Sequence, residues 1–513
     1  MKPVWFLTLA LSAALIFAAT PGAPTRSPKT GLQTFNRENV LGTSFELKLL
    51  ASSPAAARHA EATTLREIAR EAAILSSWDS SSEFSRWFHT RAKAVPVSPE
   101  LFEVLSTFDA WRDRTGGALD AAAESITRAW SAAAQQGRTP TREELDRAVA
   151  AVRQPHWKLD PAGAPSGPTA THLSNTPLAL NSFVKSYIMD RAVATALRTP
   201  GITAAVLNLG GDLVIRGPWT EPVNLADPRS DSENSAPAER LLVADRAVAT
   251  SGGYRRGFDI AGRHYSHIVD PRTGQATGHI LSATVIAPRP VDAGALATAF
   301  CVLTPEESGH LAAATSGVDY LLIPAQGAPI ASPGWSRYQA PRPALTAAAK
   351  PAPPSPAPQF ADAGMELEIT FDLARLGGSA HRPYLAVWIE NTDKFPVRTL
   401  ALWYKKERWL PDLRSWYRND RQRAAAEGNN ITASVASATR PPGKYTLKWD
   451  GKDNAGNPVK PGKYTVNIEA AREHGTYQIM RQEVDFDGTP KQFQLPGNQE
   501  ISSATIDYRK TAH

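Results

Sequence analysis

Five short segments before residue 340 combine small or flexible backbone with a polar side chain. This combination suits the close approach of a phosphate-bearing ligand, because exposed backbone N–H groups and a lone lysine can hold its anionic oxygens. The segments are residues 115–120, ending in Asp120; residues 180–191, around Lys185; residues 208–212, with Gly210 and Gly211; residues 250–254 with Thr250 and Ser251, running on to His267 and residues 267–274; and residues 292–298, from Asp292 to Thr298.

Each of these segments also has an ordinary structural explanation. Gly-Gly-Asp after a strand is typical of a turn, and Lys185 in an apolar helix can extend its ammonium group to solvent. His267 can be a hydrogen-bonded core histidine, and the His264/His267 pair lacks a third metal ligand. The residue types alone therefore leave both a ligand site and a purely structural role open.

The sequence excludes several common kinds of chemistry. It contains no Gly-x-Ser-x-Gly elbow, P-loop, His-Glu-x-x-His or Rossmann glycine motif. A single cysteine cannot form an internal disulfide, and Cys301 lies in an apolar run that predicts burial. The net charge of +6 is spread along the chain, so we expect no nucleic-acid partner.

The length of 513 residues predicts at least two domains. Residues 1–20 carry Lys2, an apolar stretch and small residues before a Pro-Gly pair, which predicts a cleavable signal peptide and a periplasmic or otherwise exported protein. An uncleaved anchor is the alternative. No later segment resembles a transmembrane span, so none is expected in the mature protein. Residues 339–360, rich in Pro and Ala, are expected to form a semi-rigid linker.

The segment before the linker, residues 35–338, mixes helical and strand patterns and predicts an α+β domain. Residues 101–111 have helical spacing, and Thr141 with Glu144 forms a capping box before a second helix. Short β-branched runs, which predict strands, occupy residues 204–209, 213–215, 240–243, 282–287 and 320–323.

The segment after the linker, residues 361–510, is predicted to be all-β. Apolar or alternating runs at residues 365–371 and 384–389 are separated by turn residues. Pro-Gly-Lys-Tyr-Thr occurs at residues 442–446 and again at 461–465, which predicts two strands joined by an acidic, Gly-rich turn. The acidic residues of that turn do not have EF-hand spacing, so we interpret them as turn residues and not as calcium ligands.

Taken in order, the segments resemble the motifs of the ApbE-type FAD:protein FMN transferases over about residues 35–335. The His-Ile-Val-Asp-Pro-Arg-Thr-Gly run at residues 267–274 contributes most to the specificity of the match. The other matching segments are residues 41–43, 76, 82–84, 115–120, 185–187, 190–192, 209–212, 250–252 and 295–299. Residues after the linker resemble an uncharacterised periplasmic β domain appended to some of these transferases, and residues 449–464 are similar to Ig-like hairpins, which implies a β-sandwich.

The resemblance implies a reaction in which Mg²⁺ assists cleavage of the FAD pyrophosphate. AMP leaves, and FMN is attached through a phosphoester to a Ser or Thr of an exported flavoprotein. His267 and Lys185 would be catalytic, with His267 acting as general base or as a phosphate contact. The residues expected to contact FAD are Asp120, Lys185, Gly210, Gly211, Thr250, Ser251 and His267, and those expected to bind Mg²⁺ are Asp292, Thr298 and the Ser182 carbonyl.

The sequence departs from the family pattern at the implied metal site. Gly294 stands where the family has an Asp four residues before the Thr, and the nearest acid is Asp292, expected to reach the metal from a loop before the helix. The glycines around the family lysine are replaced here by bulkier residues, including Ser182 and Ser186. Two alternatives therefore stay open: a non-catalytic FAD-binding protein, and an FAD pyrophosphatase that releases FMN and AMP. Thr439, in a small-residue run, is considered as a self-modified acceptor, with an ordinary surface loop favoured.

Overall fold

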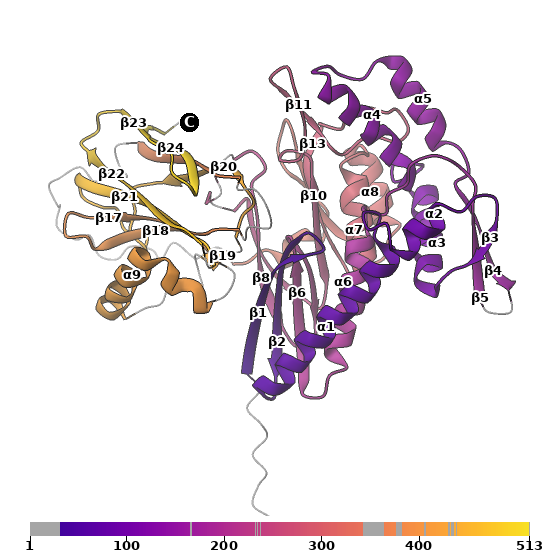
Figure 1. The fold of residues 1–513 in the computed structure, drawn as a ribbon, viewed down its shortest axis with the longest axis horizontal. Helices are drawn as coiled ribbons and strands as arrows, with labels where there is room; N and C mark the ends of the chain where they lie inside the picture. Colours follow the sequence, from indigo (N-terminus) through magenta and orange to yellow (C-terminus); the bar gives the residue numbers. More distant parts are fainter. Residues whose placement is uncertain are drawn as a thin grey trace, which may run out of the picture.

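The computed structural model describes residues 31–341 and 364–511, except residues 165–166, 231, 233, 236, 376–381, 405–406, 429–430, 432–435, 438 and 474. It has an α+β region before residue 342 and a mostly β region after residue 363 (Figure 1). The predicted signal peptide and residues 342–360 of the predicted linker lie outside the described residues.

An antiparallel sheet of eight strands forms the centre of the first region. Its order is β1-β2-β6-β7-β10-β13-β14-β15, so neighbouring strands often come from distant parts of the sequence. Most residues of β6 are apolar and buried, because both faces of this strand are covered. The strands are β1 (Gly31–Val40), β2 (Thr43–Ala51), β6 (Ile202–Leu209), β7 (Asp212–Arg216), β10 (Ala247–Gly252), β13 (Ile280–Ala287), β14 (Asp319–Pro324) and β15 (Ile330–Ala331).

Three helices cover one face of this sheet: α1 (Pro54–Leu75), α6 (Val184–Leu197) and α7 (Pro290–Phe300) (Figure 1). α1 packs on α6 and α6 on α7, while α7 lies against β10 and β13. Ser53 caps α1 by accepting a hydrogen bond from the Ala56 N–H, and Pro54 fixes its first turn. Cys301 follows α7 in this core, and burial raises the pKa of its thiol to about 12, as expected for an unreactive cysteine.

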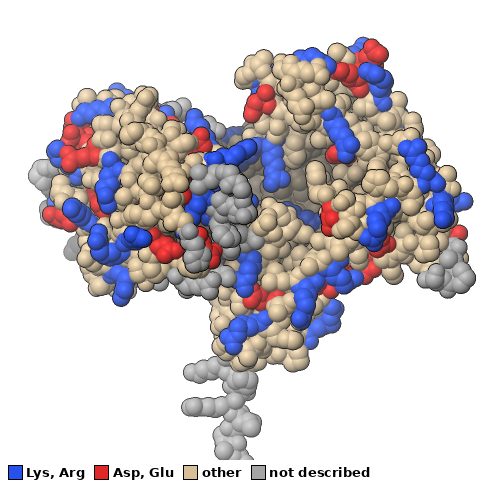
Figure 2. Space-filling model, viewed as in Figure 1, with Lys and Arg blue, Asp and Glu red and all other residues tan. Residues whose placement is uncertain are grey.

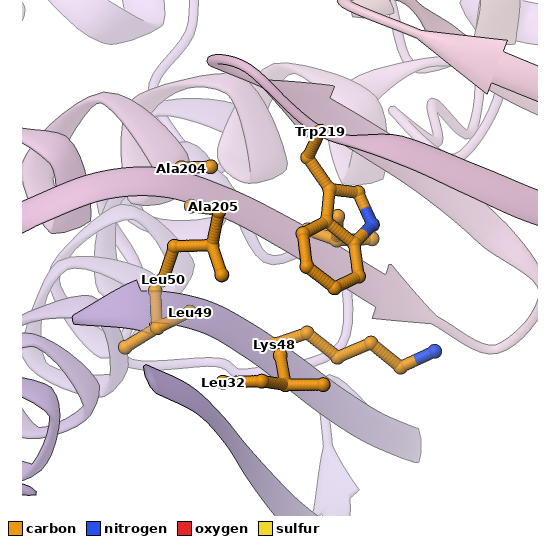
Figure 3. A pocket seen from close by; sticks show the side chains of 8 residues that line it. Leu32, Lys48, Leu49, Leu50, Ala204, Ala205 and Trp219 are labelled. Carbon is orange, nitrogen blue, oxygen red and sulfur yellow. The ribbon is translucent and has the colours of Figure 1, made fainter. Parts of the chain in front are cut away.

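The opposite face is covered by the hairpin of β8 (Thr220–Leu225) and β9 (Glu239–Ala244) and by η2 (Trp335–Tyr338). Trp219, next to β8, leans over a hollow lined by Leu32, Leu50 and the stem of Lys48 (Figure 3). That hollow has no space for a water molecule. We interpret it as a packing gap and not as a ligand site.

The remaining elements of the first region lie outside the eight-stranded sheet. The predicted helix at residues 101–111 is part of α3, and the predicted capping box of Thr141 and Glu144 opens α5, so both predictions are confirmed. These elements are α2 (Glu83–Phe88), β3 (Ala94–Pro96), α3 (Pro99–Arg114), η1 (Ala121–Ala123), α4 (Glu124–Gln135), α5 (Arg142–Val152), β4 (Trp157–Ala164), β5 (Gly167–His172), β11 (Gly257–Ile260), β12 (Arg263–Ser266) and α8 (Pro305–Ala313).

The second region contains two sheets that share one apolar core. The four-stranded sheet has the order β20-β16-β24-β23, and the five-stranded sheet has the order β19-β18-β17-β21-β22. Apolar residues of β16 and β17, one strand from each sheet, belong to the same buried cluster. The strands are β16 (Met365–Leu373), β17 (Tyr384–Glu390), β18 (Pro396–Trp403), β19 (Ala436–Ser437), β20 (Gly443–Trp449), β21 (Gly462–Ala471), β22 (Tyr477–Phe486), β23 (Lys491–Leu495) and β24 (Ile501–Lys510).

The repeated pentapeptide begins two strands joined by an acidic, Gly-rich turn, as predicted, but these strands do not form the hairpin that the resemblance of residues 449–464 implies. β20 pairs with β16, whereas β21 pairs with β17 and β22, so the connecting turn crosses from one sheet to the other. The turn residues behave as predicted, since Asp453 Oδ1 accepts the Ala455 and Asn457 N–H groups. The two copies share a local contact: Tyr445 and Tyr464 each donate a hydrogen bond of 2.7 Å to the carbonyl four residues upstream.

The second region is mostly β, as predicted, but it also contains η4 (Glu407–Asp412) and the helix α9 (Arg414–Glu427), which an all-β region would lack. α9 packs on the outer face of the five-stranded sheet through Trp416, which joins a second apolar cluster there. The helix ends at Gly428, whose φ of 68° is the left-handed conformation common at helix ends. The region is therefore mostly β-sheet with one helix on its outside.

The two regions touch through the side chain of Asn234. Its amide donates to the Lys448 carbonyl at 2.7 Å and accepts from the Lys448 N–H at 2.8 Å, which covers part of the open edge of β20. Within the described residues, no helix is both long and apolar enough to cross a membrane.

Candidate active site

Lys185 and Asp212 form an ion pair at the centre of the candidate site. Lys185 is the second residue of α6, Asp212 is the first residue of β7, and Lys185 Nζ lies 2.6 Å from Asp212 Oδ2. The other carboxylate oxygen, Oδ1, accepts the Thr250 N–H at 3.1 Å, so residues from three of the predicted segments meet here. The lysine side chain is 36% exposed, which leaves it able to contact a ligand.

Gly210 and Gly211 form the turn that positions Asp212. Leu209 pairs with Asp212 across a two-residue loop, and the glycines have φ of 59° and 98°, which suits a tight hairpin. Their N–H groups donate to the Ser44 carbonyl and to the side chain of Asn208. Both groups are thus already bonded inside the protein, and the expected donation to FAD is not part of this arrangement.

A cluster of hydroxyl and carbonyl oxygens adjoins this ion pair. The link is the Thr250–Ser251 pair, because Thr250 contacts Asp212 and Ser251 contacts the cluster. Thr298 Oγ1, on α7, is 3.3 Å from Ser251 Oγ and donates to the Ser182 carbonyl at 3.4 Å and the Gly294 carbonyl at 3.2 Å. Thr250 Oγ1, one residue before Ser251, contacts Thr284. The structure therefore brings together two of the three predicted metal ligands, Ser182 and Thr298.

Asp292 is placed in the first turn of α7, and not in a loop before the helix as expected. Six residues separate it from Thr298, which corresponds to about 240° around the helix and about 9 Å along it, so the two side chains do not share a face. Its closest basic group is Arg289 Nη1, 3.9 Å away, and burial raises the pKa of its carboxyl.

The oxygens of the Thr298 cluster fit a divalent cation only in part. All are neutral, whereas Mg²⁺ is usually held by carboxylates together with substrate phosphates. Asp212, the carboxylate joined to Thr250, is already paired with Lys185. Within residues 31–341 and 364–511 as described, no group of three or more His, Cys, Asp or Glu side chains could hold a metal ion. The residues present therefore do not form a free-standing Mg²⁺ site.

His267 follows β12 and is held by the Arg256 carbonyl. His267 Nδ1 lies 3.0 Å from that oxygen, and the His267 N–H donates to it as well. A carbonyl can only accept, so Nδ1 carries the proton and Nε2 of the neutral ring keeps a lone pair. Burial lowers the pKa of His267, which favours this neutral form.

Asp120 lines a cleft with a volume of about 540 Å³ together with Gly116, Gly117 and Arg272. These residues belong to two predicted segments, 115–120 and 267–274, which the fold brings face to face. Asp120 Oδ1 also accepts the Ala122 N–H at 2.7 Å, and burial raises the pKa of its carboxyl. The cleft is large enough for part of a dinucleotide.

Asp212 and Trp78 were not predicted as site residues from the sequence, and the prediction of an exposed Thr439 is wrong. Asp212 was noted only as part of a turn, although its place directly after Gly-Gly at the start of a strand could have indicated a fixed carboxylate. No pattern in the sequence marked Trp78 as a site residue. Its indole is 81% exposed. The neighbouring Ser77 accepts the Leu180 N–H, from the loop before α6. Thr439 is only 3% exposed and is not the surface residue that was expected.

Comparison with known proteins assigns each of the two regions to a family. The chain belongs to the ApbE family, whose model matches residues 41–322, more than half of the chain. Residues 366–503 match a second family described as "Predicted periplasmic protein (DUF2271)". The two matches correspond to the two regions of the structure.

Related proteins cover the first region. An FAD:protein FMN transferase of Treponema pallidum (strain Nichols) is 28% identical over 308 residues, covering 56% of this chain and 83% of the relative. One from Klebsiella pneumoniae (strain 342) is 24% identical and covers 63% and 93%. The crystal structure of an ApbE protein from Thermotoga maritima superimposes with a TM-score of 0.53 at 25% identity, covering 60% of this chain and all of that one. These matches confirm the predicted family and the α+β fold.

Proposed function

We propose that this protein is an exported FAD:protein FMN transferase, which attaches FMN through a phosphoester to a Ser or Thr of an acceptor flavoprotein. One observation carries the proposal: Ser182, Lys185, Asp212, Thr250, Ser251 and Thr298, from separate parts of the chain, meet in one continuous polar site. The named activity of the relatives and the predicted signal peptide support it.

The proposed reaction exchanges one phosphorus–oxygen bond for another. The acceptor hydroxyl attacks the FMN-side phosphorus of FAD, the bond from that phosphorus to the bridging oxygen breaks, and AMP leaves with the bridging oxygen. The hydroxyl proton passes to a base. FAD and a Ser or Thr hydroxyl thus give protein-bound FMN and AMP, with no oxidant or reductant required.

His267 is the proposed base. Its bond to the Arg256 carbonyl fixes the proton on Nδ1 and directs the lone pair of Nε2 away from that carbonyl. Because burial lowers its pKa, the ring is neutral and ready to accept a proton near pH 7. A phosphate contact is the other role open to His267, and the two roles differ in their effect on turnover.

Lys185 is the proposed partner of the pyrophosphate. Its ammonium has three donors, and the ion pair with Asp212 fixes the side chain without using all of them. A positive charge at that point stabilises the charge that develops on the bridging oxygen. Asp212 would therefore position Lys185 and set how much of its charge the phosphates experience.

Magnesium dependence is part of the proposal: the Ser182 carbonyl and Thr298 would supply neutral oxygen donors, Asp292 is the nearest predicted acid, and the anionic oxygens would come from the substrate phosphates. Because Asp292 lies on another face of α7, we expect any contact with a cation to pass through water. Replacing Asp292 by Ala should raise the Mg²⁺ concentration needed for half-maximal turnover. An unchanged requirement would remove Asp292 from the site.

The neutral oxygen cluster favours one second candidate, an FAD-binding protein without transfer activity. Incubation with FAD, Mg²⁺ and a candidate exported flavoprotein separates the possibilities. Protein-bound FMN, seen as in-gel flavin fluorescence, supports the transferase. Free FMN with AMP indicates a pyrophosphatase, and intact FAD with measurable binding indicates a binding protein.

A further inference from the structure

The second region carries a row of arginines on the outer surface of α9. Arg414, Arg418 and Arg421 are all exposed and follow one another at positions i, i+4 and i+7, which places them on one face of the helix. Seven residues of helix span about 10 Å. Lys and Arg side chains gather in the part of the surface that lies over α9 (Figures 1 and 2).

Acidic side chains near this face are occupied elsewhere. Asp420 and Glu427 both bind Arg423, whose side chain is fully buried, at 2.8 and 2.7 Å. Glu469 accepts the N–H groups of Ser415 and Trp416 at the start of the helix, each at 2.8 Å. In the part of the chain that the structure describes, no carboxylate forms an ion pair with Arg414, Arg418 or Arg421. The exposed face therefore keeps its positive charge.

Two of these guanidinium groups lie over aromatic rings at cation–π distance. Arg414 lies 4.8 Å from the ring centre of Tyr477, and Arg421 lies 5.8 Å from that of Tyr417. Arg481, on β22, lies beside the row, and its guanidinium is fixed by donating from Nη2 to Ser415 Oγ at 3.3 Å and from Nε to Asn467 Oδ1 at 3.2 Å. A guanidinium that contacts the face of a ring can still direct its N–H groups into two parallel bonds to a carboxylate.

We propose that the α9 arginine face, consisting of Arg414, Arg418, Arg421 and Arg481, is a docking surface for an acidic protein segment. Planar, pre-ordered arginines beside tyrosines are typical of protein interfaces and recognise paired carboxylates. A membrane surface is disfavoured, because the large apolar side chains exposed in the described residues all lie between Leu32 and Ile330, far from α9 in the sequence. The face is separate from the polar site around Lys185 and does not depend on the proposed transferase activity.

The test measures binding of a labelled, glutamate-rich peptide of about 12 residues to the full-length protein by fluorescence anisotropy. The wild-type protein should bind it at about 50 mM NaCl, and affinity should fall about tenfold or more at about 500 mM, because exposed charges are screened. The variant R414E/R418E/R421E should bind at least about tenfold more weakly. The variant R142E/R147E/K158E removes the same charge from an exposed part of the first region and should bind like wild type.

A second variant distinguishes the effect of the guanidinium geometry from the effect of its positive charge. R414K/R421K keeps the charge but loses the planar, five-donor guanidinium groups, so we expect affinity to fall several-fold. Equal weakening by the α9 and control triple variants would overturn the proposal, since it would show that only net charge matters. Co-sedimentation with phosphatidylglycerol vesicles that depends on the α9 face and exceeds peptide binding would also overturn it, in favour of a membrane surface. Thermal melting curves check that each variant is folded.

Discussion

The hydroxyl of Ser186 on α6 occupies the space that a side chain at Gly294 on α7 would need. A Cβ at residue 294 would overlap Ser186 Oγ and lie 3.1 Å from Ser186 Cβ and 3.4 Å from Phe183 Cα. The two helices are thus matched in size at this point, and both residues lie beside the oxygen cluster of Thr298.

Replacing Gly294 by Asp should therefore destabilise the protein when made alone. Overpacking of a closed helix contact costs about 1–3 kcal/mol, so the melting temperature should fall by several degrees. Ser186→Gly in the same chain should recover most of this loss. Thermal unfolding of both single variants and of the double variant forms a cycle, and additive effects would show that the two residues are not coupled.

Lys185→Ala should weaken FAD binding about tenfold or more, because it removes a point charge from the pyrophosphate. Titration of flavin fluorescence measures the effect. Lys158→Ala, at an exposed position outside the site, is the matched control. If FAD stabilises the Lys185 variant against heat as much as it does the wild type, Lys185 is a solvated helix residue and the pyrophosphate contact is wrong.

His267→Ala should lower turnover by about 10²–10⁴ and change FAD binding little, as expected when a general base is lost. Because burial lowers the pKa of His267, its base form persists below pH 6.5, and turnover should be constant above that value and fall only at lower pH. His264 provides the contrast. Burial would lower the pKa of His264, but its bonds to Asp259 and the Gly253 carbonyl outweigh this and raise it.

His264→Ala should therefore leave both turnover and its acid limb in place. A turnover profile that rises only above pH 6.5 would point to a base with a raised pKa and against His267. An equal loss of binding and turnover in His267→Ala would make His267 a phosphate contact.

Trp78→Ala should weaken FAD binding by about 1–3 kcal/mol, the usual value of stacking a flat ring on an aromatic side chain. The indole is 81% exposed in a loop bonded to the segment before Lys185, so it has a free face for an isoalloxazine or adenine ring. Trp78→Phe should keep much of the affinity. Leu173→Ala, at a side chain that is 45% exposed, is the control, and equal losses in the two alanine variants would exclude stacking.

The local elements of the fold were predictable because short-range patterns determine them. Thr141 and Glu144 are three residues apart, and the structure contains their capping box. The pairing of Lys185 with Asp212 was not predictable in this way, because it depends on how α6 packs beside a hairpin 27 residues later. The resemblance located both segments but not the contact between them.

The helix α9 was missed for a different reason. Its sequence is rich in Arg and Ala and contains few apolar residues, so its amphipathic pattern is weak. Buried contacts of Trp416 and the pairing of Glu469 with the first N–H groups stabilise it, and both depend on a sheet formed by other segments. Asp292 shows the same limit. The sequence placed it near Thr298 but did not show that α7 begins before it, and this start determines the face of the helix on which its side chain lies.

Each copy of the repeated pentapeptide of the second region begins a strand. Gly443 and Gly462 have similar φ values, 146° and 155°, and each is followed by a tyrosine bonded four residues back. The same five residues thus give the same local conformation at the start of a strand in either sheet. A shared local conformation is enough to explain the repeat, without duplication of a domain. β20 is an edge strand while β21 lies between two others, so loss of the hydroxyl of Tyr464 should disturb more neighbours than loss of that of Tyr445.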